Sequence, residues 1–348
     1  MPAEWEPHEA TWIAWPHERS DWPGKFSAIP HVYTEIVRHL HTSETVYILV
    51  NDAGAERQAK RILSHARIDL ARVQFFRFPT NRVWTRDYGP IFIRNGTGAV
   101  GVTNWRFNAW SKYSDWQRDD AIAGKLARAL RLRTWQPSIA ARRVVLEGGS
   151  IDVNGQGLLL TTEECLLDKV QARNPGLSRS ELEKVFADYL GAQKVLWLGR
   201  GIAGDDTHGH VDDVARFVGP SQVVAVVEDN SSDENYEPLE ENLRRLKNMT
   251  DVDDKPLEIV TLPMPQPVYF RERRLPASYA NFYIANDCVL TPTFNDRNDR
   301  LALGVLADLF PSRTVVGIHA VDLVWGLGTL HCLTQQQPIG GLRRPSAP

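Results

Sequence analysis

Hydrophobic positions along the chain follow two alternating patterns. Between Ile29 and Leu40 they recur at three- and four-residue spacing, which predicts an amphipathic helix. The next apolar run, residues 45–50, is short and rich in β-branched and aromatic side chains, which predicts a buried strand. The alternation continues to residue 320 and indicates an α/β protein.

The predicted elements recur in a fixed order of about two strands, a helix and a strand. Ser178 and Glu181 form a capping box for one helix, which Gly191 ends. The expected helices span residues 29–40, 54–66, 119–132, 177–191, 239–249 and 299–311. The expected strands and hairpins span residues 45–50, 72–78, 90–105, 142–149, 152–162, 194–199, 215–229, 257–264, 279–292 and 314–320.

The recurring hairpins bear on domain organisation. A single wound parallel sheet needs single strands between helices, whereas hairpins favour a circular repeat. Neither a low-complexity segment nor a Pro/Gly/Ser-rich linker interrupts the pattern. We therefore predict one domain over residues 1–340, built from about five ββαβ-like repeats, and a short loose tail over residues 341–348.

Composition and charge narrow the partners. The 348 residues are 43% hydrophobic, and 40 Lys and Arg balance 43 Asp and Glu to give a net charge of −3. This balance gives no reason to expect nucleic acid and favours a small substrate. No run approaches eighteen consecutive apolar residues, so we expect a cytoplasmic protein without a membrane partner. The three cysteines suggest neither a disulfide framework nor a structural metal site.

Four polar clusters interrupt the apolar strands at a regular interval. They contain Asp87, Glu147, His210 with Asp212, and Cys332. The steps are 147 − 87 = 60, 210 − 147 = 63 and 332 − 210 = 122, the last being about two steps of 61. If each repeat has that length, a closed ring aims all the clusters at one central site.

Such a site has a definite chemistry. Cys332 can act as a nucleophile only as a thiolate, and His210 can supply the base or the cationic neighbour that this requires. Carboxylates around the pair would oppose thiol ionisation unless the substrate is itself a cation. A guanidinium is the planar cation that paired carboxylates bind best, so Asp87, Asp212 and Glu147 would hold it. We infer attack of Cys332 on the guanidinium carbon with displacement of ammonia.

Other interpretations of these residues remain open. Taken alone, each polar cluster also fits an ordinary turn or a surface ion pair. His208, His210 and Asp212 could instead bind a metal ion and act as a metallohydrolase. Cys165 and Cys288 are interpreted as buried structural residues. A catalytically silent guanidinium-binding protein is a third possibility.

Five ordered motifs carry a resemblance to a known family. The chain resembles the agmatine deiminase and bacterial peptidylarginine deiminase family, which belongs to the guanidine-modifying enzymes of the pentein fold. The resemblance implies a five-bladed α/β propeller with pseudo-fivefold symmetry. The motifs, which span nearly the whole chain with "TWIAWPH" before them, are "WTRDYGP", "EGGSID", "THGHVDD", "NFYIAND" and "LHCLTQQQP".

The resemblance also implies a role for each site residue. Cys332 matches the nucleophile and His210 the general acid and base. Asp87 and Asp212 match the carboxylates that grip the guanidinium, and Glu147 matches the one that pairs with both substrate and histidine. The implied reaction proceeds through a covalent thiouronium, which water then hydrolyses. We expect neither a cofactor nor a metal ion.

Three positions refine the comparison. Trp84 aligns with a tryptophan that packs along the aliphatic part of the substrate. Residues 326–332 read "GLGTLHC" where the family has "GGGNIHC". His331 belongs to the motif but has no chemical role that we can assign, so we interpret it as structural.

The substrate is expected to be agmatine, giving N-carbamoylputrescine and ammonia. Its terminal amine requires an acidic far end of the pocket, which Asp115, Asp119 or Asp120 could supply. Peptidylarginine or free arginine is the alternative substrate, and an amidinotransferase or a dimethylarginine hydrolase would share the fold and the cysteine. Exposed sheet edges make a homodimer a further expectation.

Overall fold

The computed structural model describes residues 1–340, and the predicted tail, 341–348, lies outside the described residues. Within 1–340, five sheets repeat one arrangement. Two strands pair antiparallel, and the second pairs in parallel with a third that follows a helical crossover. The predicted unit of two strands, a helix and a strand is therefore confirmed in these five sheets.

The strands of the five sheets are between two and seven residues long. The first adds β3 as a fourth strand. The strands of successive sheets are β20 (Gln335–Pro338), β1 (His8–Ala14), β2 (Thr45–Leu49) and β3 (Val73–Phe76); β4 (Ile91–Arg94), β5 (Val100–Thr103) and β6 (Arg133–Trp135); β9 (Asp152–Val153), β10 (Leu158–Thr162) and β11 (Lys194–Leu198); β12 (Ala215–Phe217), β13 (Gln222–Val227) and β14 (Glu258–Pro263); β17 (Tyr283–Ile284), β18 (Cys288–Thr293) and β19 (Thr314–His319).

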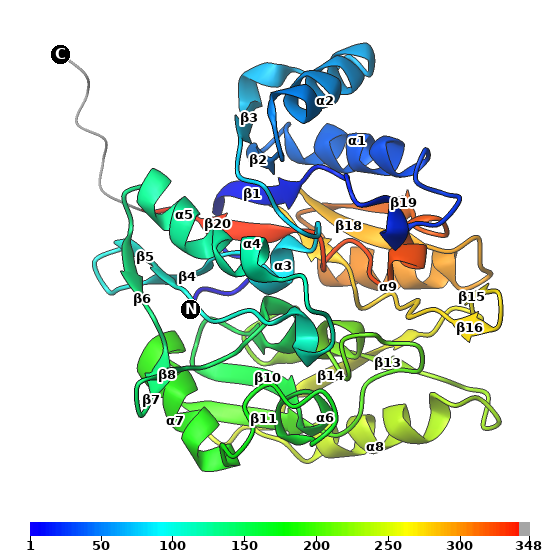
Figure 1. The fold of residues 1–348 in the computed structure, drawn as a ribbon. Coiled ribbons are helices and arrows are strands. Elements are labelled where there is room, and N and C mark those ends of the chain that lie inside the picture. The colour runs from blue at the N-terminus through cyan, green and yellow to red at the C-terminus, as the bar shows by residue number, and fades with distance from the viewer. Residues whose placement is uncertain (341–348) are drawn as a thin grey trace.

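The crossover helices lie around the outside of the sheets (Figure 1). They are α1 (Ile29–Leu40), α5 (Ile122–Ala129), α7 (Arg179–Leu190), α8 (Tyr236–Lys247) and α9 (Asp299–Leu309). The remaining helices and short strands are α2 (Ala53–His65), α3 (Thr85–Tyr88), α4 (Gln117–Asp120), α6 (Glu163–Leu167), β7 (Ser138–Ile139), β8 (Arg142–Arg143), β15 (Tyr269–Phe270) and β16 (Arg273–Arg274).

The first and last strands of residues 1–340 pair in the first sheet. Strand β20 pairs antiparallel with β1, and Trp12 lies opposite Gln335 (Figure 1). The unit that contains the last polar cluster is thus completed by the first strand of the protein. This strand was missed by the sequence analysis, although six of its seven residues are buried.

One predicted strand was assigned to the wrong place. Residues 142–149 were expected to form a strand, but only Arg142 and Arg143 do so, and they pair with β7. The third strand of the sheet that contains β4 and β5 is instead β6, which is three residues long and exposed or half-buried. Its polar sequence has no hydrophobic alternation, because a short edge strand is solvated on one side.

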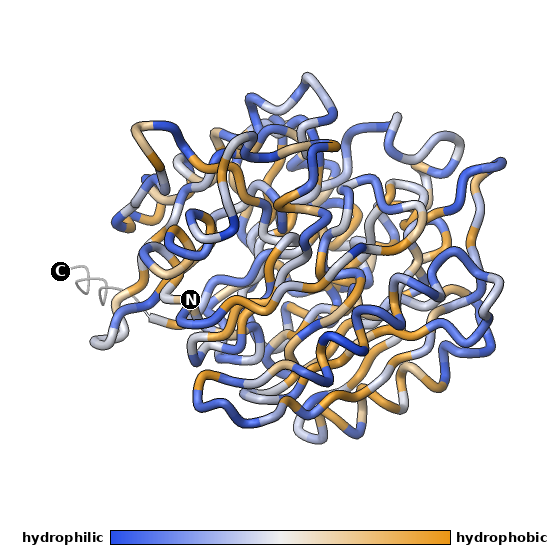
Figure 2. Tube along the Cα trace, turned by 90° about the horizontal axis from the view of Figure 1, so that it is seen from below, coloured by the Kyte–Doolittle hydropathy of each residue, from blue (hydrophilic) through white to orange (hydrophobic). Residues whose placement is uncertain are grey.

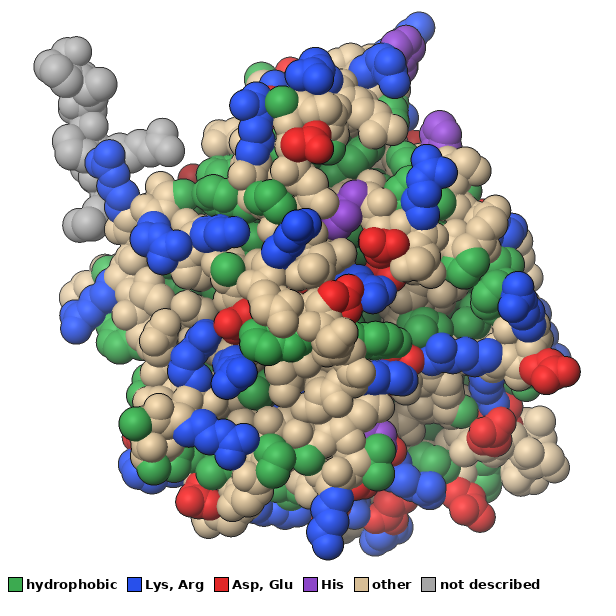
Figure 3. Space-filling model, viewed as in Figure 1, with side chains coloured by type: hydrophobic (Ala, Val, Ile, Leu, Met, Phe, Trp, Pro, Cys, Tyr) green, Lys and Arg blue, Asp and Glu red, His purple; other side chains and the backbone are tan. Residues whose placement is uncertain are grey.

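Burial follows the strands and the inward faces of the helices. Hydrophobic and hydrophilic residues alternate along the peripheral helices, as Figure 2 shows. Acidic and basic side chains are interspersed on the face drawn in Figure 3. The helices of residues 1–340 include none that is both long and apolar enough to span a membrane.

Candidate active site

The polar clusters occupy equivalent turns, each just before the first strand of a sheet. Asp87 lies in α3 before β4, and Glu147 precedes a 3₁₀ turn before β9. His210 and Asp212 lie at a similar turn before β12, and Cys332 lies three residues before β20. The regular spacing in the sequence therefore reflects a regular position in the fold.

The structure brings these five side chains together. His210 Nδ1 lies 3.8 Å from Asp87 Oδ1 and 4.0 Å from Asp212 Oδ1. Cys332 Sγ lies 3.8 Å from the other oxygen of Asp212. Glu147 is within 4.8 Å of the imidazole, measured between potential ligand atoms. All five residues are at most 6% exposed, so they interact in a water-poor environment.

The imidazole of His210 has no fixed hydrogen-bond partner. Among the described residues, neither ring nitrogen has a partner, and the same holds for Oε2 of Glu147. Burial disfavours the cation, but Asp87, Cys165 and Asp212 outweigh burial and raise the pKa of His210 well above its ordinary value. We therefore expect an imidazolium in the free protein, with donors available for a ligand.

The thiol of Cys332, in contrast, has several fixed contacts. Asn281 Nδ2 donates to the sulfur at 3.2 Å, and Asn281 Oδ1 accepts from the backbone N–H of His331 and Cys332. Burial and the carboxylates of Asp212 and Asp213, with that of Asp87, raise the pKa of Cys332 well above its ordinary value. The thiol should stay protonated until a cation enters the site.

Asn281 was missed as a site residue, although the sequence contained a signal for it. It lies in the motif "NFYIAND", and the interval of 122 between His210 and Cys332 skips one repeat. Asn281 falls in that gap, since 281 − 210 = 71 and 332 − 281 = 51. It immediately precedes Phe282 and β17, so it belongs to the turn that is equivalent to the other four.

His331 fixes the orientation of Asp212. Its Nδ1 contacts Asp212 Oδ2 at 2.7 Å, and its Nε2 contacts Glu4 Oε2 at 2.9 Å. Burial alone would raise the pKa of Asp212, but the hydrogen bond and charge of His331, with His210 and Arg216, lower it. The structural role of His331 is thus to hold the carboxylate of Asp212 in place and in its ionised form.

Glu4 is a second residue that sequence reasoning missed. It accepts hydrogen bonds from Arg86, Arg216 and the backbone N–H of Ile284 as well as contacting His331. These partners lie up to 327 positions away in the chain, and no local pattern links them. Burial opposes ionisation, but Arg216, His331 and Arg86 hold the pKa of Glu4 well below its ordinary value.

Asp87 is oriented from two sides. Trp110 Nε1 donates to Oδ2 at 2.9 Å and the backbone N–H of Gly149 donates to Oδ1 at 3.1 Å. Burial raises the pKa of Asp87 to about 6 against the opposing charge of His210, and Asp212 and Glu147 add to the rise. A cation bound beside Asp87 would relieve this accumulation of negative charge.

Gly149 is required for the carboxylates and the imidazole to meet. A Cβ at this position would lie 2.6 Å from His210 Nδ1, 2.8 Å from Asp87 Oδ1 and 3.1 Å from Asp212 Oδ2. These contacts are too short for any side chain. The second glycine of "EGG" is therefore a steric requirement of the site, not of an ordinary turn.

A cavity of about 320 Å³ leads to the thiol. Trp84 and Trp110 line it together with Asp87 and Cys332. Trp84 therefore lies in the cavity wall, and its contact with the aliphatic part of a substrate stays a prediction. Trp110 was not predicted; it belongs to a turn, Ala109–Ser111, whose residues all have positive φ.

The predicted acidic far end of the cavity was wrong in its residues. Asp115, Asp119 and Asp120 do not line the cavity. Asp119 accepts from the backbone N–H of Asn81 at 2.6 Å, Asp120 accepts from that of Phe107 at 2.9 Å, and Asp115 pairs with an arginine at the surface. The acids that do line the cavity besides Asp87 are Asp21 and Asp206.

The predicted alternative metal set is not assembled. His208 turns away from His210 and lies 3.9 Å from Glu164 and 3.8 Å from Asp168. Positive φ values at His208 and Gly209 change the chain direction, so the two histidines do not share a strand face. In residues 1–340 no group of potential ligands joins His208 to His210.

The two other cysteines have different surroundings. Cys288 lies in β18, and burial raises its pKa to about 12, which fits the predicted structural role. Cys165 is 1% exposed, as expected of a structural residue, but its sulfur lies next to Glu147 and His210. Its position at the site was not predicted.

The chain is similar to proteins of known family. Residues 1–338 match the model of the Porphyromonas-type peptidyl-arginine deiminase family, and the chain belongs to this family. It is 35% identical to the agmatine deiminase of Ectopseudomonas mendocina (strain ymp), over 97% of this chain and 95% of that protein.

Two solved structures are also similar. The agmatine deiminase of Enterococcus faecalis has a TM-score of 0.86 and 33% identity, covering 97% of this chain and 95% of that one. A substrate-bound agmatine deiminase from C. jejuni has a TM-score of 0.87 and 30% identity, covering 98% and 96%. Both likenesses extend over the whole arrangement of sheets described above.

Proposed function

We propose that the protein hydrolyses agmatine to N-carbamoylputrescine and ammonia. The observation that carries this proposal is the convergence of a thiol, an imidazole and three carboxylates beside a partly open cavity, which Asp87 and Cys332 line. Relatives that match nearly the full chain are agmatine deiminases. A flat cation satisfies the excess negative charge of this site better than a neutral substrate would.

Each residue has a part in the proposed reaction. Asp87, Asp212 and Glu147 bind the N–H groups of the guanidinium, and Trp84 packs along the aliphatic chain. The guanidinium charge lowers the pKa of Cys332, so its proton passes to solvent as the substrate binds, and the thiolate attacks the central carbon.

His210, already protonated, gives its proton to the nitrogen that departs as ammonia. A C–S bond forms and a C–N bond breaks, which leaves a covalent thiouronium on Cys332. His210 then accepts a proton from water, and the hydroxide adds to the same carbon. Cleavage of the C–S bond releases the ureido product and the free thiol.

Asp21 is the proposed contact for the terminal amine of agmatine. Its Oδ2 has no partner in the described chain, and burial raises its pKa to about 7 against the charge of Arg82. Asp206 also lines the cavity but already contacts Lys112, Tyr113 and Arg273. An ammonium near Asp21 would gain an otherwise unpaired carboxylate oxygen.

Free arginine is a second candidate, favoured by a specific observation. Arg82 and Arg273 line the same cavity and could bind the carboxylate that arginine carries and agmatine lacks. Peptidylarginine remains the third, and it would require the cavity to admit a main chain. The cavity favours agmatine because its volume of about 320 Å³ is small and because Trp84 and Trp110 are among the side chains that line it.

Ammonia release from agmatine, free arginine and an arginine-containing peptide tests the proposal directly. Agmatine should be the best substrate, Cys332→Ala should abolish turnover, and Cys288→Ala should not. A chelator should not lower the activity, whereas a metallohydrolase would be inactivated. Turnover of the peptide but not of agmatine would overturn the choice of substrate.

The repeating sheets support a further structural proposal. We propose that the five units are blades of a propeller with pseudo-fivefold symmetry and that residues 1–340 form one deiminase domain. Closure of the first sheet by β20 and β1 supports this, because it joins the first and last strands of residues 1–340 in one unit. A cytoplasmic location and a homodimer stay predictions from the sequence.

A further inference from the structure

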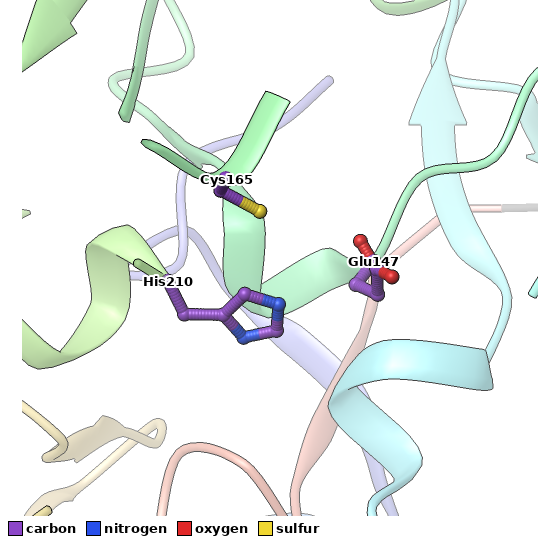
Figure 4. A group of neighbouring side chains, drawn as sticks. All are labelled: Glu147, Cys165 and His210. Carbon is purple, nitrogen blue, oxygen red and sulfur yellow. The ribbon is translucent and has the colours of Figure 1, made fainter. Parts of the chain in front are cut away.

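Cys165 contributes a second thiol to the buried end of the site. It lies in the short helix α6 (Glu163–Leu167), whereas Glu147 and His210 come from turns before β9 and β12. One potential ligand atom of each residue lies within 4.8 Å of the other two. Figure 4 shows the three side chains pointing toward one another. The proposed reaction uses Glu147 and His210 but has no role for Cys165.

Polar atoms at this cluster are left without partners. Both ring nitrogens of His210 and Oε2 of Glu147 make no hydrogen bond to the described residues, although His210 is 1% exposed and Glu147 is 0% exposed. Arg173 occupies only Oε1 of Glu147, at 3.0 Å. Buried polar atoms are nearly always paired, so their free valences point to a ligand.

We propose that Cys165, Glu147 and His210 form a binding site for one Zn²⁺ ion, whose binding inhibits the enzyme. Thiolate sulfur, imidazole nitrogen and carboxylate oxygen are the three ligand types that Zn²⁺ takes in proteins. A tetrahedral ion with bonds of about 2.0–2.3 Å holds its ligand atoms roughly 3.5 Å apart. The three side chains need to approach by only about 1 Å from a separation of 4.8 Å or less.

Charge also favours a divalent cation here. A thiolate and one carboxylate neutralise Zn²⁺, and the carboxylates of Asp87 and Asp212 lie 3.8 and 4.0 Å from Nδ1 of the imidazole. Zn²⁺ binds neutral imidazole and thiolate, so binding should release protons and weaken at acidic pH. Because the bound imidazole can no longer transfer a proton, occupancy and turnover exclude each other.

Direct binding of Zn²⁺, measured by competition with a chromophoric chelator, tests the site without relying on activity. Wild type and Cys332→Ser should bind one ion with equal affinity, since Cys332 is not a ligand. Cys165→Ala should bind more than about tenfold more weakly, because even outer residues of zinc sites contribute that much and Cys165 is a direct ligand. Cys288→Ala is the matched control and should bind as wild type does.

Two outcomes would overturn the proposal. One is wild-type affinity in Cys165→Ala, which would mean that the thiol only packs against the imidazole. The other is loss of binding in Cys332→Ser, which would assign the ion to the nucleophile. If Cys165→Ala does not fold, Cys165→Ser preserves the size of the side chain. With Co²⁺ as the probe, a thiolate charge-transfer band should be present in Cys332→Ser and absent in Cys165→Ser.

Competition between agmatine and Zn²⁺ tests the metal site separately from the proposed function. Only the inhibition by Zn²⁺ rests on the proposed function. In Cys332→Ser, which cannot turn over, agmatine should lower the apparent affinity for Zn²⁺ because both ligands use Glu147. If Zn²⁺ binds through Cys165 and agmatine has no effect, the metal site stands and the proposed placement of the guanidinium is wrong. If Zn²⁺ does not bind while agmatine is hydrolysed, the metal site alone is wrong.

Discussion

The thiol and the imidazole of the site are held in opposite ways. Cys332 is fixed by Asn281, and its neighbour Asp212 is fixed by His331, so this side is organised before any ligand arrives. His210 contacts carboxylates at 3.8–4.0 Å but has no hydrogen-bond partner in residues 1–340. In the proposed reaction, a preorganised nucleophile thus faces an acid–base group whose partners must come from the substrate, from water or from a metal ion.

Removing the imidazole of His210 should lower the activity more than any other change considered below. We expect His210→Asn to lower kcat by about 10²–10⁴-fold, the usual contribution of a positioned acid–base group. His208→Asn is the matched control, because His208 has positive φ, which asparagine adopts readily, and lies outside the cavity. It should keep kcat within about twofold. Equal losses in both variants, measured as ammonia release, would favour a metal-binding histidine pair.

Filling the space at Gly149, between the imidazole and the carboxylates, should have the next largest effect on kcat. In Gly149→Ala the new Cβ would lie 2.6 Å from His210 Nδ1 and would displace the ring. We expect kcat to fall by about 10²-fold, since small displacements of catalytic groups have effects of that order. Gly96→Ala, where a Cβ meets no atom within 4 Å, should behave as wild type. Full activity of Gly149→Ala would show that the imidazole does not work in the position described.

Placing a negative charge at position 281 should make the thiol of Cys332 harder to ionise. In Asn281→Asp, a carboxylate replaces the N–H donor 3.2 Å from the sulfur and should raise the pKa of Cys332 further. Alkylation requires the thiolate, so its rate profile should shift to more alkaline pH. A shift of one pH unit corresponds to about tenfold slower alkylation at fixed pH. Asn281→Ala, which removes the donor without adding charge, should shift the profile less; equal shifts would argue against a direct effect on the sulfur.

Sequence periodicity predicted the unit of the fold and the charged residues of the site. The capping box of Ser178 and Glu181 and the left-handed Gly191 after α7 are confirmed, because such signals are local. The interval of about 61 located the four polar clusters, since equivalent turns project side chains to the same place. The same interval left one repeat, which contains Asn281, without an assigned residue. A neutral amide is not recognisable as a site residue from the sequence alone.

Residues whose role depends on distant partners could not be predicted. Glu4 bonds to Arg86, Arg216 and His331, and its position near the start of the chain gave no indication of a central role. The acids at the far end of the cavity were misassigned for the same reason. Asp119 and Asp120 are used to accept from backbone N–H groups, and only the packed structure leaves Asp21 and Asp206 in the wall.

The smallest expected effect concerns the far end of the cavity, where substrate specificity is proposed to lie. Arg273 contacts Asp206, and its removal should make that carboxylate more available to an ammonium. Because Arg273 is half-exposed, solvent screens the change, and we expect Arg273→Ala to lower KM for agmatine by about two- to threefold. For free arginine KM should rise, since a cation that could meet its carboxylate is lost. Arg271→Ala, which lies outside the cavity lining, is the matched control. Opposite shifts for the two substrates would identify this wall as the element that distinguishes an amine from a carboxylate, whereas parallel shifts would place the selection elsewhere.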